Sequence, residues 1–231
     1  MNRAFCSTRI VHEMDARDSP RLSGRRAQAA RNDELILGAA REVFIADPSA
    51  PISAVAERAG VGIGALYRRY ESKEELMRVL CRLGLRDYVA VAERAVTLED
   101  PWESFVALMQ GLVEASVHSL TIRLAGRFIP SDDFAPLVAT AAQLNEEILG
   151  RAKNAGVVRE DLEVDDISLL LEQLAAIRVG DPKRTAQLRR RYLALQLEAL
   201  HGPAREKLPG PAPQPEELAA RWRPTQASGG G

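Results

Sequence analysis

Apolar residues recur at three- and four-residue spacing along most of the chain, which is the spacing of one face of an α-helix. The first such run begins at Arg31 and ends where Asp47 and Pro48 interrupt it. No segment alternates apolar and polar residues in the manner of a β-strand. The pattern therefore predicts an all-α protein.

Two short runs and one long run follow this first helix. The short runs occupy residues 52–59 and 62–70, and a glycine separates them. Ser72 can cap the long run, with Glu75 three residues later as its capping-box partner, and the apolar pattern then continues to Val96. We therefore expect two short helices followed by a long one.

The chain between residues 101 and 201 also carries helical patterns. Two acidic pairs, Asp132-Asp133 and Asp165-Asp166, fit helix starts, where negative charge suits the helix dipole. The predicted helices occupy residues 105–120, 121–129, 134–152, 165–178 and 182–201.

The two ends of the chain show no helical pattern. Residues 1–30 hold six arginines without an apolar period, which indicates a basic flexible arm that either touches DNA phosphates or stays a solvated tail. Met14 is an alternative translation start within it. Proline and glycine dominate from Gly202 onward, so we expect residues 204–231 to form a flexible tail.

Composition is that of an ordinary soluble globular protein, with 46% hydrophobic and 27% charged residues. No apolar run approaches the roughly 18 residues of a membrane span, and no signal peptide is evident, so we expect a cytoplasmic protein. The net charge of −1 hides an asymmetry, because residues 1–80 hold 13 Lys or Arg against 11 Asp or Glu. The two cysteines are expected to be reduced thiols.

Motifs of catalytic and cofactor sites are missing from the sequence. It contains no nucleophile elbow, phosphate-binding loop, dinucleotide-binding fingerprint or zinc-protease pattern. Its three histidines, His12, His118 and His201, lie in unrelated segments. We therefore expect no enzymatic activity, no metal and no cofactor.

Residues 52–76 combine three features of two helices that cross at a sharp turn. Ala56 is small where the helices approach most closely, Gly60 permits the positive φ angle of the turn, and Leu66 anchors the second helix in the core. Their coincidence predicts a helix-turn-helix motif at residues 51–70.

The stretch AERAGVGIGALYRRYESKEEL resembles the DNA-binding domain of the tetracycline-repressor (TetR) family, in which Ala-Gly-Val, Gly-x-Leu-Tyr and Lys-Glu-x-Leu hold the same positions. The resemblance is specific over residues 31–90. It implies that residues 62–69 form the recognition helix and that Tyr67 and Lys73 contact phosphates. Family members often carry a hydroxyl residue in place of Gly62 and threonine in place of Ala65, so this chain lacks two hydroxyl groups.

The residue types of this predicted recognition helix suit DNA contact. Free backbone amides and the helix dipole at its start favour a phosphate. Arg68 and Arg69 can pair bidentately with guanine, and we expect one of them to read a base, although either fits a solvated surface charge. Ser53 either contacts DNA or caps a helix, and Tyr67 has the alternative of a core aromatic. The predicted DNA-contacting residues are Ser53, Gly62, Ile63, Gly64, Ala65, Tyr67, Arg68, Arg69 and Lys73.

The last two predicted helices are apolar on more than one face, so each needs two packing partners. In the helix at 182–201, Leu188, Tyr192 and Leu195 mark one face, whereas Leu193 and Leu197 mark another. One face fits the protomer core and the other a two-fold interface, with a single deep monomeric core as the alternative. In the TetR family the last two long helices form a four-helix bundle between protomers, which implies a homodimer on a pseudo-palindromic operator.

The resemblance further implies a pocket for a small-molecule effector among the C-terminal helices. Each expected lining residue fits ordinary core as well. Polar groups such as His118 and Asn145 could orient a ligand there. The expected lining residues are Phe105, Met109, Leu112, Ser116, Leu144, Leu170 and Gln173.

The sequence therefore predicts a DNA-binding transcriptional regulator of the TetR type, acting as a repressor that an unidentified effector releases from double-stranded DNA. The alternative is an all-helical interaction module without a DNA target. The predicted parts are an arm at 1–30, a DNA-binding domain at 31–90, a helical ligand-binding and dimerisation domain at 91–203, and a tail at 204–231.

Overall fold

The computed structural model describes residues 20–115, 120, 124–128, 130–203 and 206–222, with the backbone alone for residues 20–27 and 222. These residues are mostly helical and form no β-strand beyond one isolated bridge between Val158 and His201, so the all-α prediction is confirmed. The helices are α1 Pro20–Ala46, α2 Ile52–Ala59, α3 Ile63–Arg69, α4 Lys73–Val96, α5 Pro101–Glu114, α7 Phe134–Asn154, α8 Val164–Ala176, α9 Pro182–Leu200 and α10 Pro215–Ala219.

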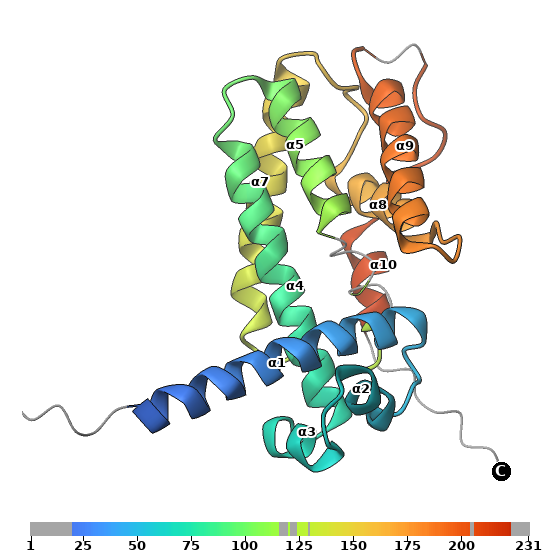
Figure 1. Ribbon diagram of the computed structural model, residues 1–231. Helices are drawn as coiled ribbons and strands as arrows, with labels where there is room; N and C mark the ends of the chain where they lie inside the picture. Colours follow the sequence, from blue (N-terminus) through green and yellow to red (C-terminus); the bar gives the residue numbers. More distant parts are fainter. Residues whose placement is uncertain (1–19, 116–119, 121–123, 129, 204–205, 223–231) are drawn as a thin grey trace, which may run out of the picture.

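Figure 1 shows two groups of helices that α4 joins. Helices α1 to α3 and the start of α4 form the lower group, and the rest of α4 enters a bundle with α5, α7, α8 and α9. None of the helices in the described ranges is long and apolar enough to cross a membrane.

The first helix begins at Pro20, earlier than the Arg31 at which the apolar pattern starts, so the prediction of a flexible arm is wrong for residues 20–30. Alanine, arginine and glutamine dominate residues 25–31 and are strong helix formers, which lets a helix extend without an apolar stripe. Residues 1–19 of the predicted arm lie outside the described residues.

The start of α4 confirms half of the predicted capping box. The Ser72 Oγ accepts the backbone N–H of Glu75 at 3.0 Å, as expected of an N-cap. The Glu75 carboxylate, however, accepts the N–H of Glu71 and not that of Ser72. The Glu75 side chain therefore binds the backbone N–H of Glu71, the residue just before the cap.

The lower core belongs to α1, α2, α3 and the first half of α4. Its fully buried side chains include Phe44, Val55 and Leu66. The connection between α5 and α7 adds Leu124 and Phe128 to the same core. Part of the segment predicted as a helix at 121–129 thus packs against the lower group of helices. Residues 121–123 and 129 lie outside the described residues.

The upper core joins the second half of α4 to α5, α7, α8 and α9. Phe105 and Met109 of α5 lie at its centre with no exposed surface. Helices α4 and α5 cross so closely that a Cβ atom on Gly111 would lie 2.6 Å from the Val91 Cγ1. A side chain at position 111 would therefore force Val91 to move.

Two arginines tie separate segments together through backbone carbonyls. Arg151 of α7 donates to the carbonyls of Val96 at 2.7 Å and Leu98 at 2.6 Å, which closes the end of α4. The Arg178 Nη1 donates to the carbonyl of Ile45 at 2.7 Å, linking the α8–α9 connection to the last turn of α1. The upper bundle is thus bonded to the lower group of helices at a second place besides α4.

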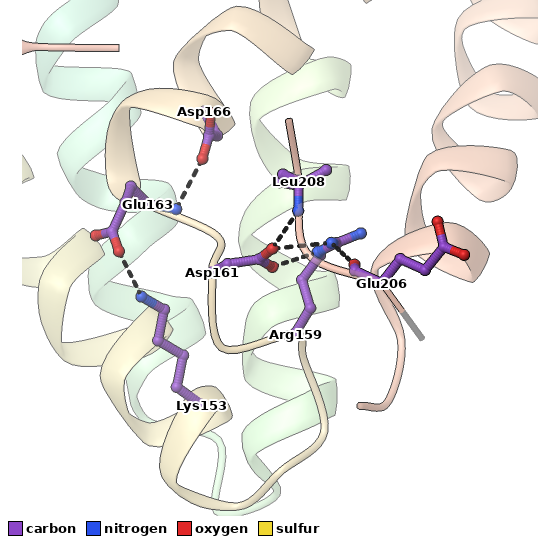
Figure 2. A network of polar contacts seen from close by, with 7 residues as sticks. All are labelled: Lys153, Arg159, Asp161, Glu163, Asp166, Glu206 and Leu208. Atoms are coloured by element: carbon purple, nitrogen blue, oxygen red, sulfur yellow. Dashed lines mark hydrogen bonds and ion pairs between the residues drawn. The ribbon is translucent and has the colours of Figure 1, made fainter. Parts of the chain in front are cut away.

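Residues 206–222, here called the C-terminal strap, fold back onto the bundle, so the prediction of a flexible tail is wrong for them. Figure 2 shows how the strap is held. Asp161 accepts the N–H of Leu208 at 2.7 Å, and the Arg159 Nη2 donates to the carbonyl of Glu206 at 2.9 Å. Arg159 and Asp161 also pair with each other, at 2.6 Å between Nε and Oδ1.

The far end of the strap lies along α8. Arg221 forms an ion pair with Glu172, and Leu218 faces Leu169 across a small hollow. The strap carries few apolar residues of its own, and its anchors are polar groups more than forty positions earlier in the chain. Local composition therefore could not reveal that it is ordered.

Replacing Asp161 with asparagine should release the strap. The Arg159 guanidinium and the Leu208 N–H hold the pKa of Asp161 well below its usual range, so the carboxylate is charged at neutral pH and the variant loses that charge. We expect trypsin to cut after Lys207 about five-fold faster or more, because local opening limits cleavage. Mass spectrometry of a digestion time course measures this rate, with E160Q as the matched control. Equal rates in the two variants would show that the Asp161 contacts do not hold the strap.

Candidate nucleic-acid interface

The turn between α2 and α3 has the geometry that the sequence predicts. Gly60 adopts φ 67° and ψ 29°, in the left-handed region that favours glycine. Its N–H donates to the carbonyl of Glu57 at 3.1 Å, and the N–H of Val61 donates to that of Ala56 at 3.0 Å. These two bonds form a Schellman motif, which ends α2 and directs the chain into α3.

Small and apolar side chains hold α3 against α2. Ala56 is buried on α2, and Leu66 and Tyr70 are buried on the inner side of the α3 segment. Leu66 thus anchors α3 in the core as predicted. Since the inner positions are filled, the other side of α3 faces away from the protein.

The outer side of α3 carries most of the predicted DNA-contacting residues. Ile63 is 43% exposed and Tyr67 is 50% exposed, so Tyr67 is not a core aromatic. Gly62, Gly64 and both arginines are exposed as well, whereas Ala65 is half-buried. The structure therefore brings these residues together on one accessible surface.

The two glycines at the start of α3 are not required by the fold. Gly62 has an ordinary φ of −66°, and a Cβ atom there would meet nothing within 4 Å. A Cβ on Gly64 would meet only the Arg68 Nη1, at 3.8 Å. No side chain caps the helix at Gly62, which leaves the amides of the first turn open to a phosphate that approaches closely.

The two arginines at the end of α3 have different surroundings. Arg69 donates from Nε and Nη2 to the two oxygens of Asp33, at 2.9 and 2.8 Å. Arg68 is exposed and makes no hydrogen bond or ion pair with another of the described residues. The geometry therefore favours Arg68 for reaching a base edge, since its guanidinium is available for a bidentate contact.

Asp33 on α1 is the functional residue that sequence reasoning missed. Besides Arg69 it accepts the hydroxyl of Tyr70 at 2.6 Å. Arg69 first, and Tyr70 next among the stabilising contacts, hold the pKa of Asp33 below its usual value, while burial raises the pKa of Tyr70. Asp33 thus fixes the end of α3 to α1, and nothing in the local sequence indicates a contact across 36 positions.

Ser53 and Lys73 lie on either side of α3 along the sequence. Ser53 is exposed in the first turn of α2, whose N-cap is Pro51, so Ser53 does not cap the helix. The Lys73 Nζ donates to the carbonyl of Ser49 at 2.9 Å and lies 5.5 Å from the ring centre of Phe44. Burial lowers the pKa of Lys73, and two of its N–H groups remain for a phosphate.

The predicted pocket residues do not form one surface. Phe105, Met109 and Leu112 are buried in the upper core, and Gln173 is exposed. Ser116 and His118 lie outside the described residues, and Leu144 and Leu170 are partly buried. The effector pocket remains a prediction.

Ser104 and Asn145 are the buried polar residues among those described, and the hydroxyl of Ser104 donates to the carbonyl of Ala95 at 2.8 Å, whereas Asn145 is only partly satisfied. Its Nδ2 donates to the Tyr88 hydroxyl at 2.7 Å, and its Oδ1 has no hydrogen-bond partner among the described residues. An unpartnered buried oxygen is costly, so it can accept a bond from a molecule that enters the core. The same region of the structure contains no cluster of His, Cys, Asp or Glu that could hold a metal ion, as far as the described residues extend.

Two family models match the chain. Residues 36–80 match the model described as bacterial regulatory proteins of the TetR family. Residues 100–202 match the C-terminal domain of SbtR-like transcriptional regulators. No curated protein matches the chain.

Solved structures of similar fold belong to the same family. A TetR regulatory protein from Mycobacterium vanbaalenii is 27% identical, with a TM-score of 0.51, and the match covers 77% of this chain and 99% of that one. The regulator SCO0520 from Streptomyces coelicolor is 24% identical, with a TM-score of 0.51 and coverage of 73% and 98%. LfrR from Mycobacterium smegmatis, solved with proflavine, is 20% identical, with a TM-score of 0.52 and coverage of 71% and 95%.

Replacing Asp33 with asparagine should loosen α3 and lower the free energy of unfolding near neutral pH by about 1 kcal/mol, a small value because Arg69 is largely exposed. The pKa of Asp33 is lowered in the folded protein, so its contribution is complete above the unfolded pKa of about 4 and is lost as the pH falls through the folded value. Urea unfolding near neutral pH and at about pH 3 measures both effects. The neighbouring E34Q is the control, and a difference between wild type and D33N that does not narrow in acid would contradict this account.

Proposed function

Because the chain belongs to the TetR family of bacterial regulatory proteins, we propose that it is a repressor: a homodimer that occupies a pseudo-palindromic operator and leaves it when a small-molecule effector binds. The single observation that carries the DNA-binding role is the outer side of α3. There Arg68, which has no partner among the residues that the structure describes, shares one accessible surface with open helix amides.

In this proposal Arg68 reads a base in the major groove, and the neighbouring groups set the position of α3. Guanine offers two acceptors that match a guanidinium, whereas phosphates carry no sequence information. Tyr67, Lys73 and Ser53 contact phosphates on either side of the groove. Arg69 supports α3 through Asp33, and the rigid support fixes the direction in which Arg68 points.

The exposed face of α9 supports the homodimer. Tyr192 is 49% exposed and Leu195 is 56% exposed, although both are large apolar or aromatic residues. Leu193 and Leu197, on the other face of the same helix, are buried in the upper core. An apolar stripe left over after the protomer core is filled fits packing against the same stripe of a second copy, which would bring two recognition helices to adjacent half-sites.

The effector role is supported by the upper core and by a relative. LfrR was solved with proflavine, which shows a small molecule bound to a protein of this fold. In this chain Asn145 places an unpartnered oxygen in the core, beside helices that contact the DNA-binding half through α4. We propose that an effector bound there favours a spacing of the recognition helices that the operator does not accept.

Replacing Arg68 with alanine should weaken binding to the operator by about 1–3 kcal/mol and reduce the preference for one base pair in each half-site. Gel shift against the DNA upstream of the protein's own gene measures this, with R94A, an exposed arginine in the last turn of α4, as the matched control. Affinity should also fall steeply with salt as phosphate contacts are lost. If R68A still gives the specific shift unchanged, Arg68 does not read a base. If the wild-type protein gives no specific shift, the chain is better explained as an interaction module without a DNA target.

Replacing Leu195 with aspartate should convert the dimer to a monomer, because it places a charge in the centre of the proposed interface. The molar mass by light scattering should halve, and operator binding should fall with it. V138D is the matched control, since Val138 is an apolar residue of α7 that is 53% exposed. A dimer that persists in L195D would move the interface away from this face of α9.

A further inference from the structure

A cleft of about 750 Å³ lies between the DNA-binding half and the upper bundle, away from the predicted effector pocket. Its lower wall comes from the last turns of α1 and from α2, and its upper wall from the end of α5, the α8–α9 connection and the first turns of α9. In Figure 1 the C-terminal end of α1 lies below the α8–α9 connection, which is where the two walls face each other. The volume is within the range of small-molecule sites.

The charged side chains of the cleft are mainly cationic. Five arginines line it against two glutamates, with no lysine, histidine or aspartate. Arg58 pairs with Glu42 at 2.7 Å, and Arg190 lies 3.6 Å from Glu114. Arg41 lies 3.6 Å from Asp87, which is outside the lining, so both glutamates and three of the five arginines are already paired. A surplus of positive charge therefore faces the cleft.

Arg189 adds a partly buried charge to this surplus. Its guanidinium donates to the carbonyls of Ala175 at 2.9 Å and Ile177 at 3.3 Å, at the end of α8, and no carboxylate is among its contacts. Burial lowers the pKa of Arg189, which shows that the charged form is incompletely compensated. An anion beside it would relieve that cost.

Apart from Thr185, the remaining lining residues carry no polar side chain, and they come from both halves of the protein. Ile45 and Ala46 of α1 lie opposite Val113 of α5 and Ala186 of α9. Arg178 bonds the carbonyl of Ile45 across the same space. A molecule with an apolar body and an anionic group would thus touch both halves of the protein at once.

We propose that this cleft binds an organic anion and acts as a control site for DNA binding. Arg58, Arg178 and Arg189 hold the carboxylate, phosphate or sulfonate group, and Ile45 and Val113 contact the apolar body. The anion joins the end of α1 to α9 and thereby changes the position of the recognition helix. The control of DNA binding rests on the function proposed above, whereas the binding of the anion does not.

The cleft stays accessible in the proposed homodimer. Ala186 and Arg190 line it from α9. At about 100° per residue they lie roughly half a turn around the helix from Leu188, which belongs to the exposed stripe. Thr185 and Arg189 also line the cleft and lie within about 60° of Tyr192 around the helix. A second copy packed on that stripe would therefore border the cleft on one side and leave the side of Ala186 and Arg190 open.

The test uses the fluorescent sulfonate 1-anilinonaphthalene-8-sulfonate and its uncharged analogue N-phenyl-1-naphthylamine on the full chain. We expect the sulfonate to bind more tightly than the analogue, and R58Q and R189Q to raise its Kd by about five-fold or more. R94Q is the matched control, and R189K, which keeps the charge, should restore most of the affinity. Circular dichroism of each variant verifies that it is folded.

Hydrogen exchange locates the probe independently of the substitutions. We expect the sulfonate to slow exchange in residues 41–46 and 178–190 of the wild-type protein. Protection confined to other segments, or equal affinities in wild type, R58Q and R189Q, would overturn the proposal. The effect on DNA is then measured by gel shift with and without the sulfonate, and an unchanged shift at saturating probe would overturn the control role. Wild type that binds no specific DNA without probe would instead overturn the proposed function and leave the anion site intact.

Discussion

The architecture depends on α4 belonging to two hydrophobic cores at once. Leu76 and Leu80 of its first half are fully buried with the DNA-binding helices, and Tyr88 and Ala92 of its second half are buried with α5, α7 and α9. Leu85 contacts both cores. A helix of this kind cannot tilt in one core without disturbing the other, because packed interiors do not deform gradually. Any change in the upper bundle that moves α4 therefore reaches the recognition helix.

Adjacent residues of the candidate interface have different roles: some hold α3 in place and others are exposed. Helix α3 is only seven residues long and could not hold a fixed direction alone. Leu66 anchors it in the lower core, and Asp33 holds its end through Arg69 and Tyr70. The guanidinium of Arg68 is exposed and is therefore available for the base contact proposed above. A rigid support for one free guanidinium gives more selective contact than two mobile ones, because less conformational entropy is lost on binding.

The sequence predicted the elements whose cause is local. Apolar spacing located α2 to α5 and α7 to α9, and Gly60 located the turn, because these signals act within a few residues. The outward position of Tyr67 agrees with the phosphate contact that the family resemblance implies. What the sequence could not supply were contacts between distant polar groups, such as Asp33 with Arg69 and Asp161 with Leu208. Such pairs do not recur at a regular spacing in the sequence. The ordered strap and the bond of Arg69 to Asp33 were missed for that reason.

The crossing of α4 and α5 at Gly111 determines how a movement would spread. The Val91 side chain packs directly on the backbone of Gly111, which has no side chain of its own, so we expect α4 to pivot at this crossing. From Val91 to Lys73 the helix is about 27 Å long at 1.5 Å per residue. A pivot of about 5° at this crossing would therefore move the start of α4, and the base of α3 with it, by roughly 2 Å. Helix α4 would then act as a lever whose short arm lies in the upper bundle and whose long arm ends beside α3.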